Sequence, residues 1–421
     1  MRVMVISNLY PPDVRGGYEL ACSQMVDALR TRGHSVEVLT SRSCIDTTGG
    51  STIHRRFHLT DEFSLHGPGN DPLVFRTREA ESRLIQSYNV QILLGALREF
   101  DPDVVYLHNP VGLGGLGLLA ALDRVGTPWL WHLGDSVPRD LFSTSDGVIP
   151  GLAARFRGIL QGRFVAVSHR TLQECGVVGI SKGPSVTLLP YWFTGSRTSS
   201  SRRPYRGGPL RVVVAGRVDA QKGSDRLIES VAQLRELGIE DVTVDFYGRI
   251  GCTSLVALIR AMGLERHVRL LGPLPHEELV ERYADYDVFA FPTQEREPFG
   301  IGPIEAMARG CVPLLSAQCG VAEWLVHGVH CLKAPRTATG FAESLAAIRQ
   351  GRVNLPRLSQ RAERAAWDDF HINSIVPKVE HCLQVAMRER RSRSADDGTI
   401  LRMARLGELL TRSFVEDAVA G

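Results

Sequence analysis

The sequence lacks several features that would place the protein in a specialised class. It has no apolar run of about 18 residues, so no membrane-spanning helix is predicted. It has no large excess of one charge, because 49 basic and 46 acidic residues give a net charge of +3. This balance does not indicate a nucleic-acid partner. The apolar run at residues 3–6 breaks at Ser7-Asn8, which predicts a strand and not a signal peptide.

Closely spaced cysteine pairs are also missing. None of the eight cysteines forms a C-x-x-C pair. With no signal peptide, this spacing predicts free thiols in a reducing, cytoplasmic location. The cysteines lie at positions 22, 44, 175, 252, 311, 319, 331 and 382.

The length and the apolar pattern predict two α/β domains. The chain has 421 residues, more than one hydrophobic core usually supports. Hydrophobic residues make up 43% and charged residues 23%, as in soluble globular enzymes. Short apolar runs alternate with amphipathic segments, which is typical of buried parallel strands joined by helices. In the first half, strands are expected at 3–6, 36–39, 104–107, 129–131, 164–167 and 186–189.

A break at residues 194–209 divides the chain. This segment is rich in Ser, Gly, Pro and Arg and has no apolar period, so it is predicted to be a linker. It separates a doubly wound domain at 1–193 from a second one at 210–367. Strands of the second domain are expected at 210–215, 242–247, 268–271, 288–291 and 312–315.

Residues 368–421 are predicted to form a C-terminal extension. A helical pattern covers about 356–391, and a polar stretch follows at 388–398. The last segment is expected to be a helix that packs on the body or on a partner subunit. Its apolar residues are Ile400, Leu401, Met403, Leu406, Leu409 and Leu410. Contact with a membrane surface is the lesser alternative, because the apolar stripe is interrupted.

A glycine-rich turn at 299–302 leads into a short predicted helix. Pro303 suits the start of that helix, and Gly310 is placed to end it. The backbone N–H groups of Gly300 and Ile301, next to Phe299, then point out of the positive helix end, which is a potential anion site.

Two carboxylates flank the same turn. Glu305 falls in the first helical turn, where it can reach a ribose hydroxyl beside the anion, and Glu297 can reach a further part of the ligand. A phosphate between two polyhydroxylated ends describes a nucleotide diphosphate sugar. The alternative is an ordinary helix whose first turn carries acidic residues.

A second loop, at 216–223, follows the strand at 210–215 directly. Gly216 opens the loop, and Ser224 is a natural N-cap for the next helix. Arg217 and Lys222 therefore lie at a strand end and a helix start, where two cations would neutralise a diphosphate. A pair of ordinary surface charges is the alternative.

Glycines and histidines mark further loops of the first domain. Gly16 and Gly17 precede a helix, where paired glycines allow close approach of a ligand and unusual backbone dihedrals. His108 and His132 each follow a predicted strand, and Asp135 is near enough to orient His132 or hold an acceptor hydroxyl. Strand-end histidines are otherwise often structural.

The order of these motifs resembles that of the retaining glycosyltransferases of family four, which have the GT-B fold. Glu297 and Glu305 match the family's Glu–seven residues–Glu motif, and the resemblance covers residue 1 to about 385. It implies an α/β fold with two Rossmann-like domains facing each other across a cleft that holds the active site. It also implies a C-terminal helix that crosses back to the first domain.

The resemblance implies retaining transfer of a sugar from a nucleotide diphosphate sugar, expected to be a UDP- or GDP-sugar, to an acceptor hydroxyl, without a metal or other cofactor. We expect catalytic roles for Glu297, His132, Arg217 and Lys222. Donor contacts are expected from Gly16, Gly17, Gly216, Arg217, Lys222, Arg249, Phe299, Gly300, Ile301 and Glu305. Acceptor contacts are expected from His108 and Asp135.

Three departures from the family pattern bear on the donor and acceptor. Residues 190–193 read Pro-Tyr-Trp-Phe where many members have Pro-Asn-Gly, and Gly134 is inserted between His132 and Asp135. The loop at 248–251 reads Gly-Arg-Ile-Gly where the commoner form is Gly-x-Gly. An epimerase or phosphorylase of the same fold, or a non-catalytic sugar-nucleotide binding protein, are the alternatives. The acceptor, the oligomeric state and peripheral membrane contact stay open.

The D-x-D sequence Asp285-Tyr286-Asp287 resembles a metal motif of other glycosyltransferases. It precedes the strand at 288–291, at the end opposite to the ligand-binding edge, so it is predicted to be structural. Because Arg217 and Lys222 can carry the diphosphate charge, no Mg²⁺ is expected.

Overall fold

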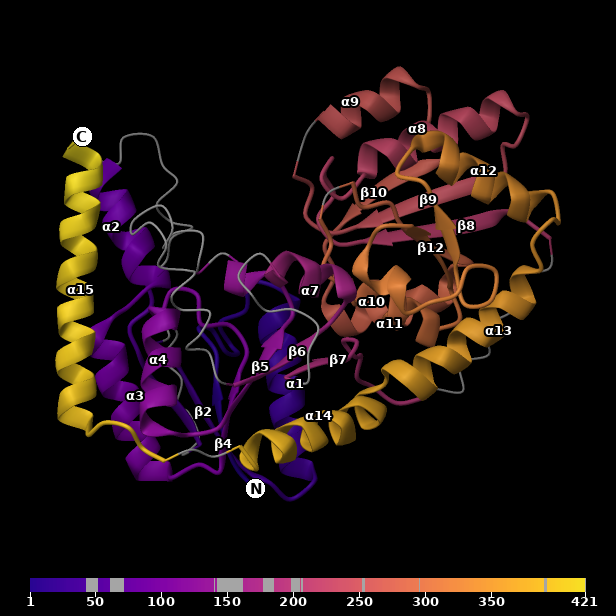
Figure 1. Ribbon diagram of the computed structural model, residues 1–421. Coiled ribbons are helices and arrows are strands. Elements are labelled where there is room, and N and C mark those ends of the chain that lie inside the picture. Colours follow the sequence, from indigo (N-terminus) through magenta and orange to yellow (C-terminus); the bar gives the residue numbers. More distant parts are fainter. Residues whose placement is uncertain are drawn as a thin grey trace. The chain divides into compact units, whose positions relative to one another are not determined.

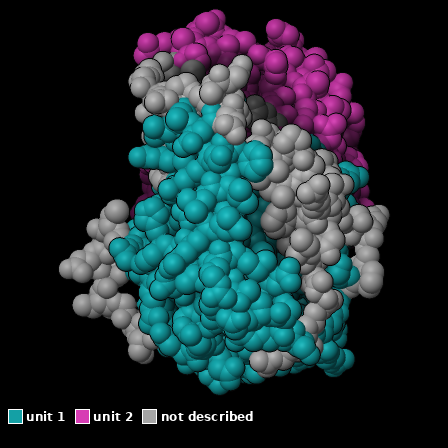
Figure 2. Space-filling model, turned by 60° about the vertical axis from the view of Figure 1, so that its left-hand side comes forward, with its two compact units in different colours: residues 1–189, 376–421 teal, residues 190–375 magenta. Residues whose placement is uncertain are grey.

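A computed structural model gives the structure of the protein and describes residues 1–42, 52–60, 72–139, 141, 162–176, 185–197, 205, 207–251, 254–294, 296–389 and 392–420. The chain forms two compact units, coloured separately in Figure 2. Unit 1 contains residues 1–189 and 376–421, and unit 2 contains residues 190–375. The predicted boundaries at 193, 209 and 367 stay predictions, and part of the linker lies outside the described residues.

Unit 1 is built on a parallel sheet with the strand order β3-β2-β1-β4-β5-β6-β7 (Figure 1). Every strand predicted in the first half is present, and one edge strand, β3, was not predicted. The strands are β1 (Arg2–Ile6), β2 (Ser35–Ser41), β3 (Ile53–Phe57), β4 (Val104–Leu107), β5 (Trp129–Leu133), β6 (Arg163–Ala166) and β7 (Val186–Leu188). The helices are α1 (Gly17–Thr31), α2 (Pro72–Arg83), α3 (Ser87–Phe100), α4 (Gly115–Val125) and α7 (His169–Gly176).

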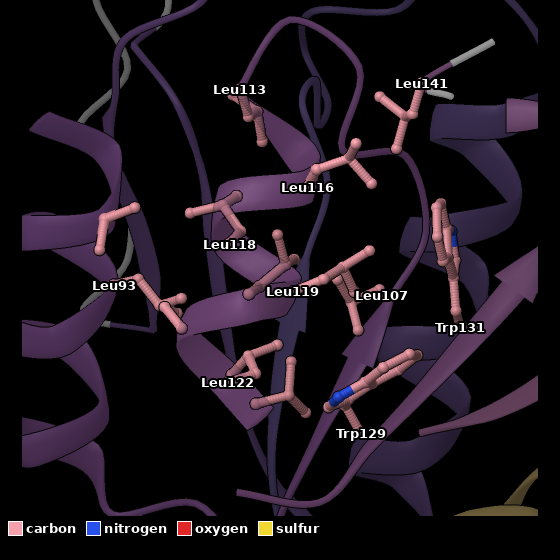
Figure 3. Packing of buried hydrophobic residues seen from close by; sticks show 14 of the residues in the cluster. Leu93, Leu107, Leu113, Leu116, Leu118, Leu119, Leu122, Trp129, Trp131 and Leu141 are labelled. Carbon is pink, nitrogen blue, oxygen red and sulfur yellow. The ribbon is translucent and has the colours of Figure 1, made fainter. Parts of the chain in front are cut away.

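The core of unit 1 lies between the sheet and its covering helices. Figure 3 shows leucines of α4, among them Leu116 and Leu119, directed toward Leu107 of β4 and Trp131 of β5. Each of these side chains is almost completely removed from water. Burial of such side chains is the main force that holds helices on a sheet, at about 1.5–3 kcal/mol for each fully buried large side chain.

Unit 2 repeats the plan with a parallel sheet of order β10-β9-β8-β11-β12-β13. All five predicted strands are present, and the short edge strand β13 was missed. The strands are β8 (Leu210–Ala215), β9 (Val242–Tyr247), β10 (Val268–Gly272), β11 (Val288–Phe291), β12 (Val312–Ser316) and β13 (Leu332–Ala334). The helices are α8 (Ser224–Glu236), α9 (Ser254–Ala261), α10 (His276–Arg282), η2 (Tyr283–Asp285), α11 (Gly302–Ala308), η3 (Gly320–Glu323) and α12 (Ala338–Arg349).

The segment predicted as one helix over 356–391 is interrupted. It consists of α13 (Leu355–Ala365), a π-helical turn η4 (Ala366–Phe370) and α14 (Ile372–Met387), with His371 in an extended conformation between them. The residues of α14 from Val376 onward belong to unit 1, so this helix crosses back to the first domain as predicted. There Glu380 accepts hydrogen bonds from Arg32, at 2.6 Å, and from the His34 ring, at 2.8 Å.

The last helix, α15 (Asp397–Ala420), packs on the body as predicted, along α2, α3 and α4 (Figure 1). Its inner face buries Ile400, Ala404 and Val415. The prediction was wrong for Met403, Leu406, Leu409 and Leu410, whose side chains are exposed. Glu408 accepts a hydrogen bond of 3.0 Å from the backbone N–H of Ser87, the first residue of α3. A carboxylate at this place satisfies an N–H group that has no partner inside its own helix.

The six cysteines in the described part of the chain are buried free thiols, and Cys44 and Cys252 lie outside it. Burial raises the pKa of Cys319 to about 12, which keeps that thiol protonated and unreactive. The free thiols agree with the prediction from cysteine spacing.

Candidate active site

The loop after β8 is fixed by backbone contacts on both sides. Gly216 donates to the carbonyl of Tyr247 at the end of β9, at 3.0 Å, and Val218 donates to the carbonyl of Arg249, also at 3.0 Å. Further along, the backbone N–H of Lys222 donates to Asp219 Oδ1 at 2.9 Å. These bonds hold the loops after β8 and β9 together, so the two predicted cations start from a rigid backbone.

Two glycines allow this close packing. A Cβ on Gly248 would lie 1.7 Å from the carbonyl oxygen of Gly216, and one on Gly223 would lie 2.0 Å from that of Pro292. Gly223 has φ +73° and is the N-cap of α8, so the prediction of Ser224 as the cap was wrong. At this site only glycine provides both the left-handed backbone and the space.

Arg217 and Lys222 differ in exposure. The Arg217 side chain is 60% exposed and touches Asp219, at 3.4 Å, and Gln221, at 3.1 Å. The Lys222 side chain is 30% exposed. Both contacts of Arg217 lie within its own loop, which leaves most of its donors in water and available for a ligand.

The predicted turn and helix at 297–310 are present. Glu305 lies in the first turn of α11, and Gly310, with φ +82°, follows the helix end. Gly300 has φ +98°, and a Cβ there would lie 2.6 Å from the ring of Phe291. Among the described residues, the backbone N–H groups of Gly300 and Ile301 have no hydrogen-bond acceptor. They are the free donors that the sequence predicted.

The turn is also tied to the next loop of the sheet. Gly320 donates to the carbonyl of Glu297, at 2.9 Å, and Val321 donates to that of Phe299, also at 2.9 Å. Phe299 is buried and its ring contacts Tyr191 edge to face, with 5.8 Å between the centroids. Tyr191 lies in the segment 190–193, where the sequence departs from the family pattern. It therefore contacts the turn through Phe299.

The two loops meet through side chains. Lys222 Nζ lies 2.5 Å from Glu297 Oε2, and the Glu297 side chain is 11% exposed. The sequence singled out both residues but did not predict this ion pair. A carboxylate with so little contact with water needs a cationic or hydrogen-bonding partner, and Lys222 provides it.

Glu305 also has a partner that sequence reasoning missed. The ring Nε2 of His276, the first residue of α10, lies 2.7 Å from Glu305 Oε1. The hydrogen bond to Glu305 raises the pKa of His276, and burial opposes the shift. No sequence signal marked His276, because the two residues are 29 positions apart and on different helices.

The paired glycines of unit 1 begin α1. Gly16 is the N-cap, with φ −167°, so the unusual dihedral that the sequence suggested is not found there. A Cβ on Gly16 would meet nothing within 4 Å. The backbone N–H of Gly16 donates to Glu19 Oε2 at 2.9 Å, which fixes the loop. The open space beside Gly16 fits the other predicted role, close approach of a ligand.

The two strand-end histidines of unit 1 are completely buried and stacked, with 5.5 Å between the ring centroids. Burial lowers the pKa of His132 to about 3, and it lowers the pKa of His108 well below its ordinary value. Both rings are therefore neutral at physiological pH. His132 Nδ1 is hydrogen bonded to Tyr106 at 2.7 Å, and the Tyr18 hydroxyl donates to the His132 carbonyl at 2.8 Å.

Tyr18 and Tyr106 are partners that the sequence did not identify. Asp135 accepts a hydrogen bond of 2.6 Å from the backbone N–H of Ser136. The contacts of His132 with a sugar, and of His108 and Asp135 with an acceptor, stay predictions.

The remaining predicted features are the Arg249 side chain, the D-x-D sequence and the absence of a metal site. Arg249 is exposed beside the loop after β8. In the D-x-D sequence, Asp287 is buried and accepts a hydrogen bond of 3.0 Å from the backbone N–H of Arg211, which is a structural use. Within the part of the chain that the structure describes, no group of three or more His, Cys, Asp or Glu side chains could hold a metal ion, and no helix is long and apolar enough to cross a membrane.

Two family models match adjacent parts of the chain. The model "Glycosyl transferase 4-like domain" matches residues 16–192, and the model "Glycosyl transferases group 1" matches residues 197–365. The chain belongs to the group 1 glycosyltransferases. Its two Rossmann-like sheets are those of the GT-B fold.

Known proteins resemble the chain over most of its length. A glycogen synthase of Mycobacterium tuberculosis is 24% identical over 414 residues, covering 93% of this chain and 96% of the relative. A GDP-mannose-dependent α-mannosyltransferase of the same organism is 28% identical over 340 residues, covering 76% and 80%. The crystal structure of Anabaena HepE in complex with UDP superposes with a TM-score of 0.65 at 17% identity, covering 91% of this chain and 100% of HepE.

Proposed function

We propose that this glycosyltransferase transfers a sugar from a nucleotide diphosphate sugar to an acceptor hydroxyl with retention of anomeric configuration. The observation that carries the proposal is the ion pair of Lys222 with Glu297, whose turn also carries the free N–H groups of Gly300 and Ile301. It combines a cation and backbone donors for a diphosphate with a carboxylate for sugar hydroxyls.

The departing diphosphate is the group that most needs stabilisation. Lys222 and Arg217 supply positive charge, and Arg217 can grip a phosphate through two donors. The helix α11 has seven residues, so its dipole is small and the two side chains carry most of the charge compensation. A well-placed donor at a developing charge is typically worth about 3 kcal/mol of transition-state stabilisation.

The carboxylates have separate roles in this proposal. Glu305 accepts hydrogen bonds from the ribose, and Glu297 accepts them from hydroxyls of the transferred sugar. When the anomeric carbon loses its phosphate oxygen, positive charge develops on the sugar ring, and Glu297 stabilises it. His132, neutral in this fold, would act through hydrogen bonding and not as a cation.

We propose that the bond changes take place on one face of the sugar, without a covalent enzyme intermediate. The bond between the anomeric carbon and the phosphate oxygen breaks, and the acceptor oxygen forms its new bond on the same face of the sugar. The departing phosphate oxygen takes the proton of the acceptor hydroxyl, so no protein base is required. This course is the one that the resemblance to retaining family-four enzymes implies.

The relatives support the choice of donor class. HepE was crystallised with UDP, and the mycobacterial mannosyltransferase is named for its dependence on GDP-mannose. We therefore propose a UDP- or GDP-sugar as the donor.

A thermal-shift panel with UDP, GDP, ADP and their sugar conjugates, with and without EDTA, tests the donor site. A ligand at one hundred times its Kd stabilises the unit that binds it by about 2.7 kcal/mol, so binding is expected to raise Tm measurably. EDTA is expected to have no effect. If no nucleotide raises Tm, the donor site assigned here is wrong.

Matched variants extend this test to the diphosphate contacts. Arg217→Ala is expected to weaken binding of the active nucleotide about tenfold, the cost of a lost charge-assisted hydrogen bond. Arg226→Ala, which removes an exposed arginine of α8, is the control and should leave binding unchanged. Turnover separates an enzyme from a binding protein, since only an enzyme releases nucleoside diphosphate when an acceptor is present.

A further inference from the structure

Glu305 lies in a place where a carboxylate needs support. Its side chain is 11% exposed, on a helix of seven residues. A carboxylate with this little water is costly unless a donor faces it, and its rotamer is undefined unless the donor is fixed. The contact to His276 Nε2, at 2.7 Å, meets both needs.

The contact gives the two carboxylate oxygens of Glu305 different roles. A carboxylate only accepts hydrogen bonds, so the proton of this bond belongs to His276 Nε2. The bond engages Oε1. Oε2 is then left to accept from a second group, and two hydroxyls on neighbouring carbons, as on a ribose, suit one carboxylate oxygen held in a fixed direction.

His276 is well placed for a positioning role. Its side chain is 48% exposed, so it contributes little to the core, and it begins α10 directly after Pro275. The Leu279 N–H donates to the Pro275 carbonyl at 2.9 Å, which fixes the backbone that carries the imidazole. The His276 side chain is half exposed but bonded to a nearly buried carboxylate. This combination favours a role in ligand binding over a role in stabilising the fold.

We propose that His276 is a positioning residue that holds Glu305 by one oxygen, so that the other reads the 2′- and 3′-hydroxyls of the donor nucleotide. This inference rests on the proposed function, because it concerns the same donor site. It predicts that His276 contributes to affinity only for nucleotides that carry ribose hydroxyls. His276 would thus help the enzyme to discriminate between ribonucleotides and deoxyribonucleotides.

The proposal also predicts a dependence on pH. The acidic groups that face His276 are Glu305 and Glu277, and both favour its cation. Tyr283, which interacts with Glu305, is buried and its pKa is well above its ordinary value, so it stays protonated. The charged imidazole holds Glu305 more firmly than the neutral one, so discrimination is expected to weaken as pH rises through the raised pKa of His276.

The experiment measures the Kd of UDP and GDP and of their 2′-deoxy analogues by isothermal titration with the full-length protein. His276→Ala is expected to weaken the ribonucleotide about tenfold and to remove the pH dependence of the ratio. The 2′-deoxynucleotide, which keeps only the 3′-hydroxyl, should be weakened less. His276→Gln, whose amide can donate in place of the ring, is expected to restore much of the ratio at a constant value across pH. Glu278→Ala, on the same helix and paired with Arg282, is the control.

The outcomes are separable. If wild-type protein binds a ribonucleotide and His276→Ala keeps the full ratio, this inference is overturned while the proposed donor site stands. If His276→Ala weakens both nucleotides equally, the residue acts on the fold of the site and not through the ribose, and the inference is again overturned. If wild-type protein binds neither nucleotide, the proposed function itself fails.

Discussion

Lys222 Nζ lies 2.5 Å from Glu297 Oε2, although the two residues are 75 positions apart and on different loops. Because a ligand phosphate would also attract Lys222, the carboxylate and the phosphate share one cation. The pair links the two side chains. In the proposed donor site, the diphosphate and sugar halves would therefore depend on each other. The roles of Lys222 and Glu297 can therefore be distinguished by mutating one residue at a time.

Replacing Glu297 by glutamine is expected to reduce transfer by a factor of about 10²–10³, the usual effect of losing one group that stabilises developing charge. Binding of nucleoside diphosphate should be unchanged or tighter, because Lys222 loses its competing carboxylate. Release of nucleoside diphosphate from the donor sugar and isothermal titration measure the two effects. A near-normal rate in this variant would rule out the catalytic role of Glu297.

Gly223 and Gly238 form a matched pair. Their φ values are +73° and +75°, but a Cβ on Gly223 would collide with the Pro292 carbonyl, whereas one on Gly238 would meet nothing within 4 Å. Gly238→Ala is expected to cost about 1–2 kcal/mol of stability, the price of the left-handed backbone alone. Gly223→Ala should cost more and should also weaken nucleotide binding, because the loop carrying Lys222 must move. Urea unfolding and isothermal titration of both variants test this, and equal effects would contradict the role given to the contact.

The buried histidines predict acid sensitivity of unit 1. An unfolded histidine has a pKa of about 6.5, and that of His132 in the fold is about 3. Between these values the unfolded state binds more protons, so stability is complete above about pH 6.5 and is lost as pH falls. The expected loss is about 1.4 kcal/mol per pH unit for each such histidine.

Urea unfolding at pH 7.5 and 5.5 measures this slope before carboxylates contribute. His108→Leu is expected to reduce the loss of stability between these two pH values by about 1.4 kcal/mol, because the pKa of His108 is lowered in the same direction. His381→Gln, which changes an exposed histidine of α14, is the control. An unchanged slope in His108→Leu would show that His108 is not buried in its neutral form.

The packing of α15 can be tested with neighbouring residues. Ala404 is buried against the body, and Arg405 is exposed on the outer face. Ala404→Asp places an unpaired charge in the interface and is expected to cost about 3 kcal/mol or more. Arg405→Asp makes the larger change of charge but should cost less than about 0.5 kcal/mol. Similar melting temperatures for the two variants would show that α15 does not stabilise unit 1.

Burial explains which strands the sequence predicted. The central strands are continuous apolar runs, because both of their faces are covered. The edge strand β3 alternates less clearly, since its residues 53–56 are only partly buried, and β13 has three residues, one of them Lys333. Edge strands have weak hydrophobic patterns, so they are not predicted from apolar runs.

The sequence predicted which residues belong to the candidate site, but not the side chains with which they form hydrogen bonds. Glu297, Lys222 and Glu305 were recognisable because each lies beside a strand end or a helix start. The contacts of His276 with Glu305 and of Tyr106 with His132 were not, because they join residues 29 and 26 positions apart through tertiary packing. The break at His371 was hidden for a related reason: residues 356–391 keep a helical pattern, and the interruption is set by backbone pairing with Phe193.

That pairing has a topological consequence. Phe193 donates to the Phe370 carbonyl at 3.1 Å, and Ile372 donates to the Phe193 carbonyl at 3.0 Å, so the entry and exit of unit 2 lie side by side. Unit 2 is thus an insertion within a discontinuous unit 1, and its adjoining ends are the arrangement that allows domain excision and circular permutation. Residues 190–375 can therefore be treated as a portable module, which would carry the proposed donor site with it when it is moved to another first domain.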